Sequence, residues 1–142
     1  AVKYFDEALA KETENDKKAE MAYATAAALM QAKKLSQARS YCQKAMSFKE
    51  NYGEPYILLA QLYGSNPNWT DEPALNKCTY FVVIDKLQRA KAVAPSVTER
   101  ANELISTYSR HTPQAKDLFM LGYKAGDRIT IGGWIGESTT IR

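Results

Sequence analysis

The sequence has little of the side-chain chemistry that metal sites need. Its 142 residues include two cysteines and one histidine. Cys42 and Cys78 lie 36 positions apart, and neither belongs to a Cys-x-x-Cys pair. A zinc site needs several such ligands at short spacings, so we expect no metal and no cofactor. A disulfide between the two cysteines is the alternative if the protein is exported and their α-carbons lie within about 7 Å.

Recognisable catalytic motifs are also missing. The chain contains no Gly-x-Ser-x-Gly, no His-Glu-x-x-His and no phosphate-binding loop. Gly132, Gly133 and Gly136 have a spacing faintly like that of a glycine-rich loop, but no helix is predicted after them. His111 is alone at the end of a predicted helix, where a histidine is usually a helix-terminal cation or a surface residue. We therefore expect no catalytic residues and a function that is not enzymatic.

Long apolar runs and dense positive charge are absent as well. No stretch approaches the roughly 18 consecutive apolar residues that a membrane-spanning helix needs. The formal net charge is +3, and acidic residues are interspersed among the basic ones. A nucleic-acid-binding surface usually has a denser basic stripe. These features predict neither a membrane span nor a nucleic-acid partner.

What the sequence does have is a 34-residue period. Residues 19–52 and the segment that opens at Gly53 carry small, aromatic and aliphatic residues at matching offsets. In the second segment one predicted helix reads Tyr56-x-x-Leu59-Ala60-x-x-Tyr63, and the other reads Val83-x-x-x-Leu87-x-x-Ala90-x-x-x-x-Pro95. Small residues such as Ala60 and Ala90 let two helix axes approach to about 8–10 Å. A period of this kind indicates a stacked helical-repeat scaffold.

The same pattern extends to both sides of these two repeats. We predict a mainly α fold over residues 1–126, with the second helix of a truncated repeat at 1–15, repeats at 19–52 and 53–97, and a capping helix at 98–111. On this interpretation the chain begins inside a repeat and is the C-terminal piece of a longer protein. The compartment then stays open: periplasm or cell envelope if a signal peptide precedes the chain, and cytoplasm otherwise.

The second repeat contains an insertion. Sixteen residues separate Asn66 from Val83, where the repeat pattern leaves room for five. The added residues, near 67–77, are rich in turn formers and include Trp69. Insertions in repeat arrays often lie at a binding edge, so Trp69 is a candidate contact residue for a partner. The alternative, which we favour, is that Trp69 folds back over the helix pair, because tryptophan is usually well buried.

The C-terminal residues 127–142 have the composition of β-strands. Gly136-Glu137 fits the centre of a type II′ turn, which predicts a hairpin that pairs Trp134 with Thr139. In that register Trp134 and Ile141 share one face, and we name both as candidate contacts of the tail. An isolated hairpin is only marginally stable, so we favour docking on the last helices. Strand exchange with a second copy or with a partner is the alternative.

Residues 19–97 resemble the tetratricopeptide repeat (TPR) family, and together with the Gly-Gly-Trp-Ile-Gly tail the chain looks like a group of bacterial repeat proteins of this type. The resemblance implies a superhelix of antiparallel helix pairs whose first helices line a concave groove for a protein or peptide. Carried over to this sequence, it implies concave-face contacts, with a solvated helix face as the alternative, at Tyr23, Ala27, Met30, Ile57, Gln61, Asn102, Ser106 and Arg110.

This implied groove differs from the carboxylate-clamp type of the family. Only Asn102 and Arg110 could contact a partner's C-terminal carboxylate, whereas Tyr23, Met30 and Ile57 suit an apolar or amphipathic segment. That segment could be the protein's own tail. We therefore expect a non-catalytic protein-interaction scaffold that could also self-associate through the tail. The alternative is an accessory domain of a larger enzyme, or of an envelope- or carbohydrate-associated protein, whose active part lies upstream.

Overall fold

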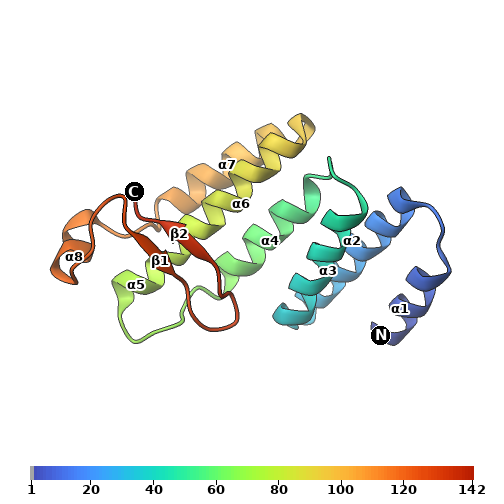
Figure 1. The fold of residues 1–142 in the computed structure, drawn as a ribbon, viewed down its shortest axis with the longest axis horizontal. Coiled ribbons are helices and arrows are strands. Elements are labelled where there is room, and N and C mark those ends of the chain that lie inside the picture. Colours follow the sequence, from blue (N-terminus) through green and yellow to red (C-terminus); the bar gives the residue numbers. More distant parts are fainter. Residues whose placement is uncertain (1) are drawn as a thin grey trace.

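The structure is mainly α-helical and ends in a short β-hairpin, as the sequence predicts. It is a computed structural model, and it describes residues 2–142. Figure 1 shows the helices following one another from the N-terminus, with two strands at the C-terminal end. The elements are α1 (Val2–Lys11), α2 (Asn15–Gln31), α3 (Leu35–Phe48), α4 (Glu54–Ser65), α5 (Pro73–Lys77), α6 (Thr79–Val93), the 3-10 helix η1 (Pro95–Val97), α7 (Thr98–Ser109), α8 (Ala115–Met120), β1 (Arg128–Thr130) and β2 (Ser138–Thr140).

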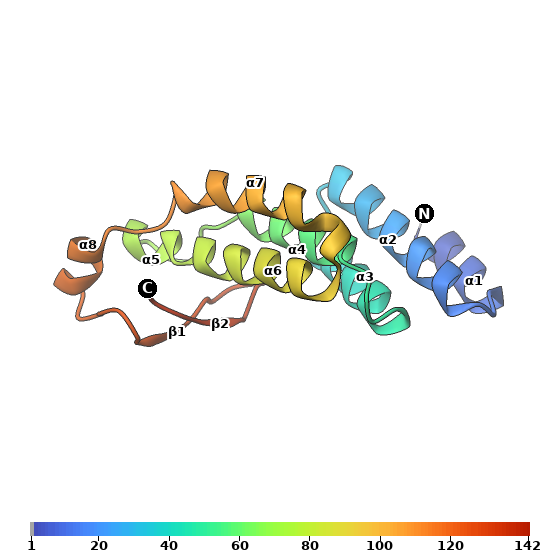
Figure 2. The same cartoon turned by 90° about the horizontal axis from the view of Figure 1, so that it is seen from above.

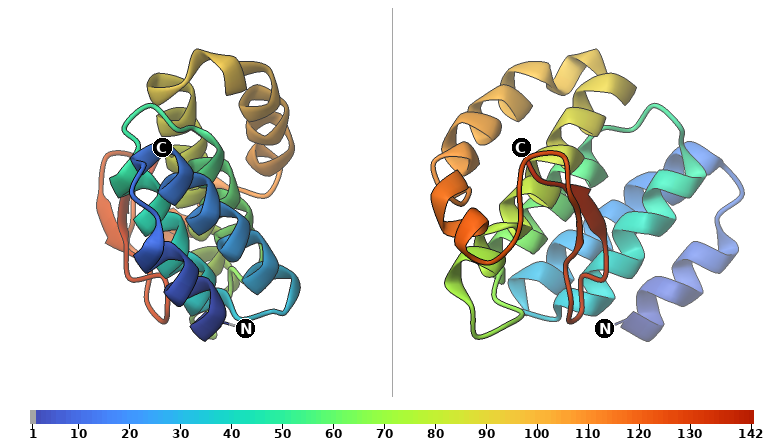
Figure 3. Two further views of the ribbon diagram at one scale, coloured as in Figure 1. Left: turned by 90° about the vertical axis from the view of Figure 1, so that its right-hand side faces the viewer. Right: turned by 60° about the vertical axis from the view of Figure 1, so that its left-hand side comes forward.

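Helices that are neighbours in the sequence pack against each other. α1 contacts α2, α2 contacts α3, α3 contacts α4, α4 contacts α6, and α6 contacts α7. The short helix α5 lies within the predicted insertion and separates α4 from α6. Figure 3 shows this array from two further sides, with the hairpin lying over the helices. Such nearest-neighbour packing is how helical-repeat arrays bury their apolar faces.

Alanines fill the contacts between paired helices. The contact of α2 with α3 and that of α4 with α6 each contain alanines that are no more than 1% exposed: Ala22, Ala26, Ala38, Ala45, Ala60 and Ala90. Because an alanine side chain is a single methyl group, the two helix axes can approach closely at these points. The small residues that define the sequence pattern therefore lie at helix–helix contacts.

The turn between α2 and α3 is built around a lysine with a left-handed backbone. Lys33 has a φ of 60°. The N–H of Lys34 donates to the carbonyl of Leu29, and the N–H of Lys33 donates to the carbonyl of Met30, both at 2.9 Å. These two bonds form the Schellman arrangement that ends many helices. Glycine usually occupies such a position, because left-handed geometry costs a residue with a Cβ roughly 1–2 kcal/mol.

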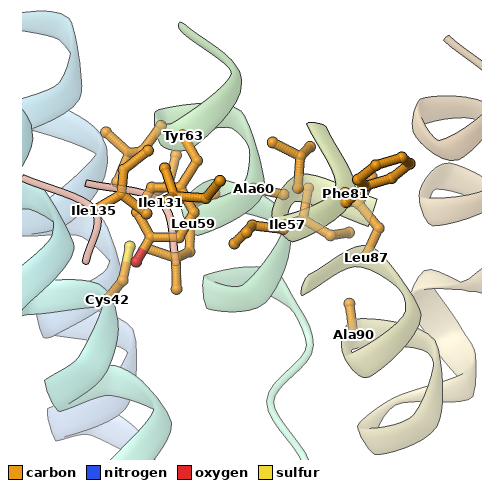
Figure 4. Close-up of a cluster of buried hydrophobic side chains, with 14 of the residues drawn as sticks. Cys42, Ile57, Leu59, Ala60, Tyr63, Phe81, Leu87, Ala90, Ile131 and Ile135 are labelled. Atoms are coloured by element: carbon orange, nitrogen blue, oxygen red, sulfur yellow. The ribbon is translucent and has the colours of Figure 1, made fainter. Parts of the chain in front are cut away.

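The hydrophobic core continues from the helices into the residues after Gly126. Figure 4 shows Cys42 of α3 and Tyr63 of α4 in one cluster with Ile131 and Ile135 from the C-terminal segment. Ile131 and Ile135 are 0% and 3% exposed, so water is excluded from both side chains. Full burial of a side chain of this size contributes about 1.5–3 kcal/mol. We call residues 127–142 the tail; it completes the core.

The hairpin forms in a different register from the predicted one. Arg128 pairs with Thr140, Ile129 with Thr139, and Thr130 with Ser138. Residues 131–137 form the connection, so the predicted two-residue turn at Gly136-Glu137 is wrong, and so is the strand pairing of Trp134 with Thr139. The physical reason is burial. The connection inserts Ile131 and Ile135 into the core, and this gain outweighs the local preference for a tight turn.

The tail docks on the helices, which is the alternative favoured from the sequence. β2 contacts α6, and the hydroxyl of Thr139 donates to the Asp85 carboxylate of α6 at 2.6 Å. Figure 2 shows the strands on one side of α6 and α7 on the other. The tail therefore covers the side of α6 that faces away from α7.

Candidate functional site

A groove between α2, α4 and α7 is the candidate functional site. It encloses about 400 Å³. α2, α4 and α7 each contribute side chains to its lining, and the contribution of α7 is the ring of Tyr108. The residues that line the groove are Ala27, Met30, Gln31, Leu58, Gln61, Gly64, Ser65 and Tyr108. None of these side chains carries a formal charge.

The groove brings together three of the residues that the sequence singles out. Ala27 and Met30 are half-buried on α2, and Gln61 faces them from α4. Ala27 and Met30 are three positions apart, so they lie on the same face of a helix with 3.6 residues per turn. The side chains of two helices that are far apart in the sequence thus form one surface.

Ile57 is a correction to the predicted groove. It is 2% exposed, and Figure 4 shows it in the core with Phe81 and Leu87 of α6. The next residue, Leu58, lines the groove instead. One residue turns a helix by about 100°, so an error of one position moves a side chain from the groove to the core.

Tyr108 is a groove residue that the expected contacts do not include. Its ring packs against the backbone of α4 at Gly64, where a Cβ atom would lie 2.7 Å from Cε1 of the tyrosine. No side chain other than that of glycine leaves room for this approach. Burial, followed by the nearby Tyr80, raises the pKa of the Tyr108 hydroxyl. A glycine inside a predicted helix was the available sequence signal for this close contact.

The other predicted concave-face residues do not line the groove. Tyr23 is half-buried and packs edge-on against Tyr52, with ring centroids 5.8 Å apart. Burial, and to a smaller extent Glu54, raises the pKa of Tyr23. The α7 residues Asn102 and Ser106 are exposed and lie outside the lining.

Arg110, which directly follows α7, borders a separate hollow. The imidazole of His111 stacks on the ring of Tyr80 there, with centroids 5.2 Å apart. Within residues 2–142 no group of three His, Cys, Asp or Glu side chains is arranged to hold a metal ion.

The tail does not enter the groove, because its backbone and side chains are bound to α3, α4 and α6. The guanidinium of Arg39 on α3 donates to the backbone carbonyls of Trp134 and Ile135, the latter at 2.8 Å. The hydroxyl of Tyr63 donates to the Glu137 carboxylate, which also forms an ion pair with Lys86 at 2.6 Å. The suggestion that the groove holds the protein's own tail is therefore wrong for this structure.

The two candidate contacts in the tail face inward. The indole of Trp134 is half-buried and lies edge-on against the Tyr63 ring, with centroids 5.4 Å apart. Its N–H is buried without a hydrogen-bond partner in the described structure, so the ring is held by packing and by the Arg39 guanidinium, which lies 5.9 Å from the ring centroid. Ile141 is 2% exposed and belongs to the core. In this structure neither side chain is presented as a contact for a partner.

Trp69 joins the insertion to the tail. Its indole N–H donates to the carbonyl of Leu75 at 3.1 Å, and its ring lies against Gly132. The amide side chain of Asn76 supports the loop, accepting from the backbone N–H groups of Trp69 and Thr70 and donating to the carbonyl of Thr70. Trp69 therefore folds back, as the favoured alternative predicts, and the surface it covers includes the tail.

Both cysteines are free and buried in the structure. Burial raises the pKa of Cys42 to about 12 and that of Cys78 to about 11. A thiol with a raised pKa has little thiolate at neutral pH and is a poor nucleophile.

No family model, curated protein or solved structure matches this chain. The resemblance to tetratricopeptide repeats therefore remains an expectation from the sequence pattern. None of the helices described over residues 2–142 has both the length and the hydropathy required to cross a lipid bilayer.

Proposed function

We propose that this protein is an interaction scaffold of the tetratricopeptide-repeat type that binds a segment of another protein in the groove. The observation that carries the proposal is the position of the groove. It lies between α2, α4 and α7, which correspond to the first helices of the expected repeats and of the capping helix. The tail is bound on other helix faces, so the groove is open.

The lining of the groove suits an amphipathic segment with an apolar residue pointing inward. Met30 and Leu58 offer apolar surface. Gln31, Gln61 and Ser65 offer neutral hydrogen-bonding groups, and an amide side chain can both donate and accept. Laying the apolar face of a segment into such a groove is a recurring mode of peptide recognition. A segment held only by charge would find no partner in the lining.

The same lining supports a role without catalysis. The only titratable side chain in the groove is that of Tyr108, and its pKa is raised by burial. A general acid or base works best when its pKa lies near the working pH. A tyrosine hydroxyl with a raised pKa is far from that condition.

Two variants of α2, each replacing an alanine by arginine, test the groove directly. Peptides would be selected from a random library against the complete chain, and the affinity of each selected peptide measured by fluorescence anisotropy. Ala27→Arg places a long charged side chain in the groove, and it should weaken binding at least about tenfold, or roughly 1.4 kcal/mol.

Ala24→Arg is the matched control, because Ala24 is exposed on the same helix and outside the lining. It should leave the affinity within about twofold, roughly 0.4 kcal/mol. Equal loss in both variants, or selected peptides that bind Ala27→Arg as well as the unchanged protein, would overturn the proposal.

A further inference from the structure

A second hollow lies beside the groove, between the insertion and the end of α7. It encloses about 460 Å³. Two prolines of the insertion, Pro67 and Pro73, form part of its wall. Asn76, whose side-chain amide donates to the carbonyl of Thr70 in the loop, forms another part. The remaining lining consists of side chains that can donate hydrogen bonds: Asn68, Lys77, Tyr80, Arg110 and His111. We call this space the insert hollow.

Lys77 and Arg110 bring two formal positive charges to the insert hollow without a compensating carboxylate. Lys77, Arg110 and His111 make no ion pair and no side-chain hydrogen bond among residues 2–142, and no Asp or Glu is part of the lining. Asp71 and Glu72, which are close in the sequence, lie outside it. Elsewhere in the chain the comparable Lys86 forms an ion pair at 2.6 Å.

Such a set of donors fits an anionic group. A guanidinium presents a planar pair of N–H donors to a carboxylate or a phosphate, and a lysine ammonium adds a second charge from another direction. The Tyr80 hydroxyl and the Asn68 amide have no partner within the described chain and can donate as well. All these groups are on the surface, so an anion reaches them without any movement of the backbone.

A stack of three rings connects the insert hollow to the groove. Tyr80 stacks on His111 with centroids 5.2 Å apart, and on Tyr108 with centroids 6.0 Å apart. His111 borders the insert hollow and Tyr108 borders the groove. Extended chain rises roughly 3.3 Å per residue, so about three to four residues of a bound segment would span the stack.

Gly64 sets the position of this stack. A Cβ at residue 64 would overlap Tyr108, so the glycine lets the ring settle against α4 and within stacking distance of Tyr80. The ring stack therefore lies between the groove, which Tyr108 borders, and the insert hollow, which Tyr80 and His111 border.

We propose that the insert hollow binds the anionic group, a carboxylate or a phosphate, of the same segment whose apolar residue lies in the groove. The link to the segment rests on the proposed function of the groove. The affinity of the hollow for an anion does not, because it depends on the donors that line the hollow itself, above all Lys77 and Arg110. The two parts are therefore tested separately.

In the first experiment the ¹⁵N-labelled 142-residue chain is titrated with inorganic phosphate and with acetate at constant ionic strength. NMR monitors the amide signals during each titration. Sodium chloride serves as the control for screening. The amides of Lys77, Tyr80, Arg110 and His111 should shift in a saturable way with phosphate and with acetate, but not with chloride. A Lys77→Gln/Arg110→Gln double variant should lose these shifts.

The matched control for charge is the Lys116→Gln/Lys124→Gln variant, which removes two exposed lysines that border a different cavity, next to α8. It should keep the shifts at the insert hollow. Shifts that are absent in the unchanged protein, or that persist in the Lys77→Gln/Arg110→Gln variant, would overturn the assignment of an anion site.

The second experiment uses a peptide that binds the groove and carries a glutamate three or four residues from its apolar anchor. Changing that glutamate to glutamine should weaken binding about tenfold to the unchanged protein, and by less than about twofold to the Lys77→Gln/Arg110→Gln variant. Replacing the glutamate by phosphoserine distinguishes a preference for phosphate from one for carboxylate.

The outcomes separate the two proposals. Equal binding of the glutamate and glutamine peptides to the unchanged protein would overturn the link between the hollow and the segment, while leaving the function of the groove intact. Failure of every selected peptide to depend on Ala27 would overturn the groove and the link together, and the phosphate and acetate titrations would then decide the anion site alone.

Discussion

Gly132 lies directly against the indole of Trp69: a Cβ atom at residue 132 would be 2.8 Å from Cε3 of the tryptophan. This contact joins the two segments in which the sequence departs from its repeat, the insertion and the tail. Each segment covers the other, and both lie beside the helices instead of projecting into solvent. The distinctive parts of the sequence therefore have a structural role that the repeat pattern alone does not reveal.

Gly132→Ala should destabilise the protein by about 1–3 kcal/mol, because an added methyl group overpacks a filled contact. The backbone of Gly132 does not have a positive φ, so the loss comes from the contact itself. Thermal and chemical denaturation measure it. In a Trp69→Leu background the same change should cost clearly less. Strictly additive losses would show that the two residues do not interact in this way.

Removal of the tail should abolish stable folding. A chain ending at Gly126 loses the buried side chains of Ile129, Ile131, Ile135 and Ile141, each 7% exposed or less. At about 1.5–3 kcal/mol each, this loss is comparable to the roughly 5–15 kcal/mol that stabilises a typical domain. Circular dichroism and light scattering compare the two chains. A shortened chain that keeps its melting temperature and stays monomeric would contradict the role of the tail in the core.

Lys33→Gly should stabilise the protein by up to about 1 kcal/mol, because glycine adopts the left-handed backbone of the turn after α2 without a steric cost. The gain is smaller than the full cost of the left-handed geometry, since glycine also gains entropy in the unfolded chain. Urea denaturation measures the change. Lys34→Gly, at a position with a negative φ, is the control and should destabilise. A loss of stability in Lys33→Gly would contradict the geometry described for this turn.

The stability of the protein should fall as the pH rises above 9, partly because of Cys42. Burial raises the pKa of this thiol from 9.0 to about 12. Above pH 9 the unfolded chain releases the thiol proton while the folded chain keeps it, so the free energy of unfolding decreases as pH rises. One such group contributes a slope of at most about 1.4 kcal/mol per pH unit.

Urea denaturation of the reduced protein between pH 8 and pH 11 measures this slope. The Cys42→Ala variant is less stable at neutral pH because it loses buried volume, but its stability should decline less steeply with pH. Identical slopes in the two proteins would show that Cys42 is not the titrating group.

The longer helices α2, α3, α4, α6 and α7 lie within the segments predicted as helical, because their signals are local and periodic, whereas the short helices α5 and α8 were not predicted. Ala60, Ala90 and Pro95 fix spacing and helix ends whatever the rest of the chain does. The hairpin register could not be predicted, since it depends on Ile131 and Ile135 finding space in a core built by distant helices. A local turn preference is weaker than that burial.

In the candidate site too, some residues were expected from the sequence and others depend on contacts between distant segments. Ala27, Met30 and Gln61 were expected from the resemblance to tetratricopeptide repeats, and they line the groove. The position of Ile57 was missed because one residue decides which face of α4 it occupies. Tyr108 and the stack with Tyr80 and His111 depend on contacts between residues far apart in the sequence, which no single periodic pattern contains.

We propose that a partner segment lies between α2, α4 and α7 while the tail stays bound elsewhere. Chemical-shift mapping of the ¹⁵N-labelled chain with a selected peptide tests it most directly. We expect shifts of the amide signals of Met30, Gln61 and Tyr108, and unchanged signals for Trp134 and Ile135. Shifts concentrated at Trp134 and Ile135, with those of the groove unchanged, would contradict it.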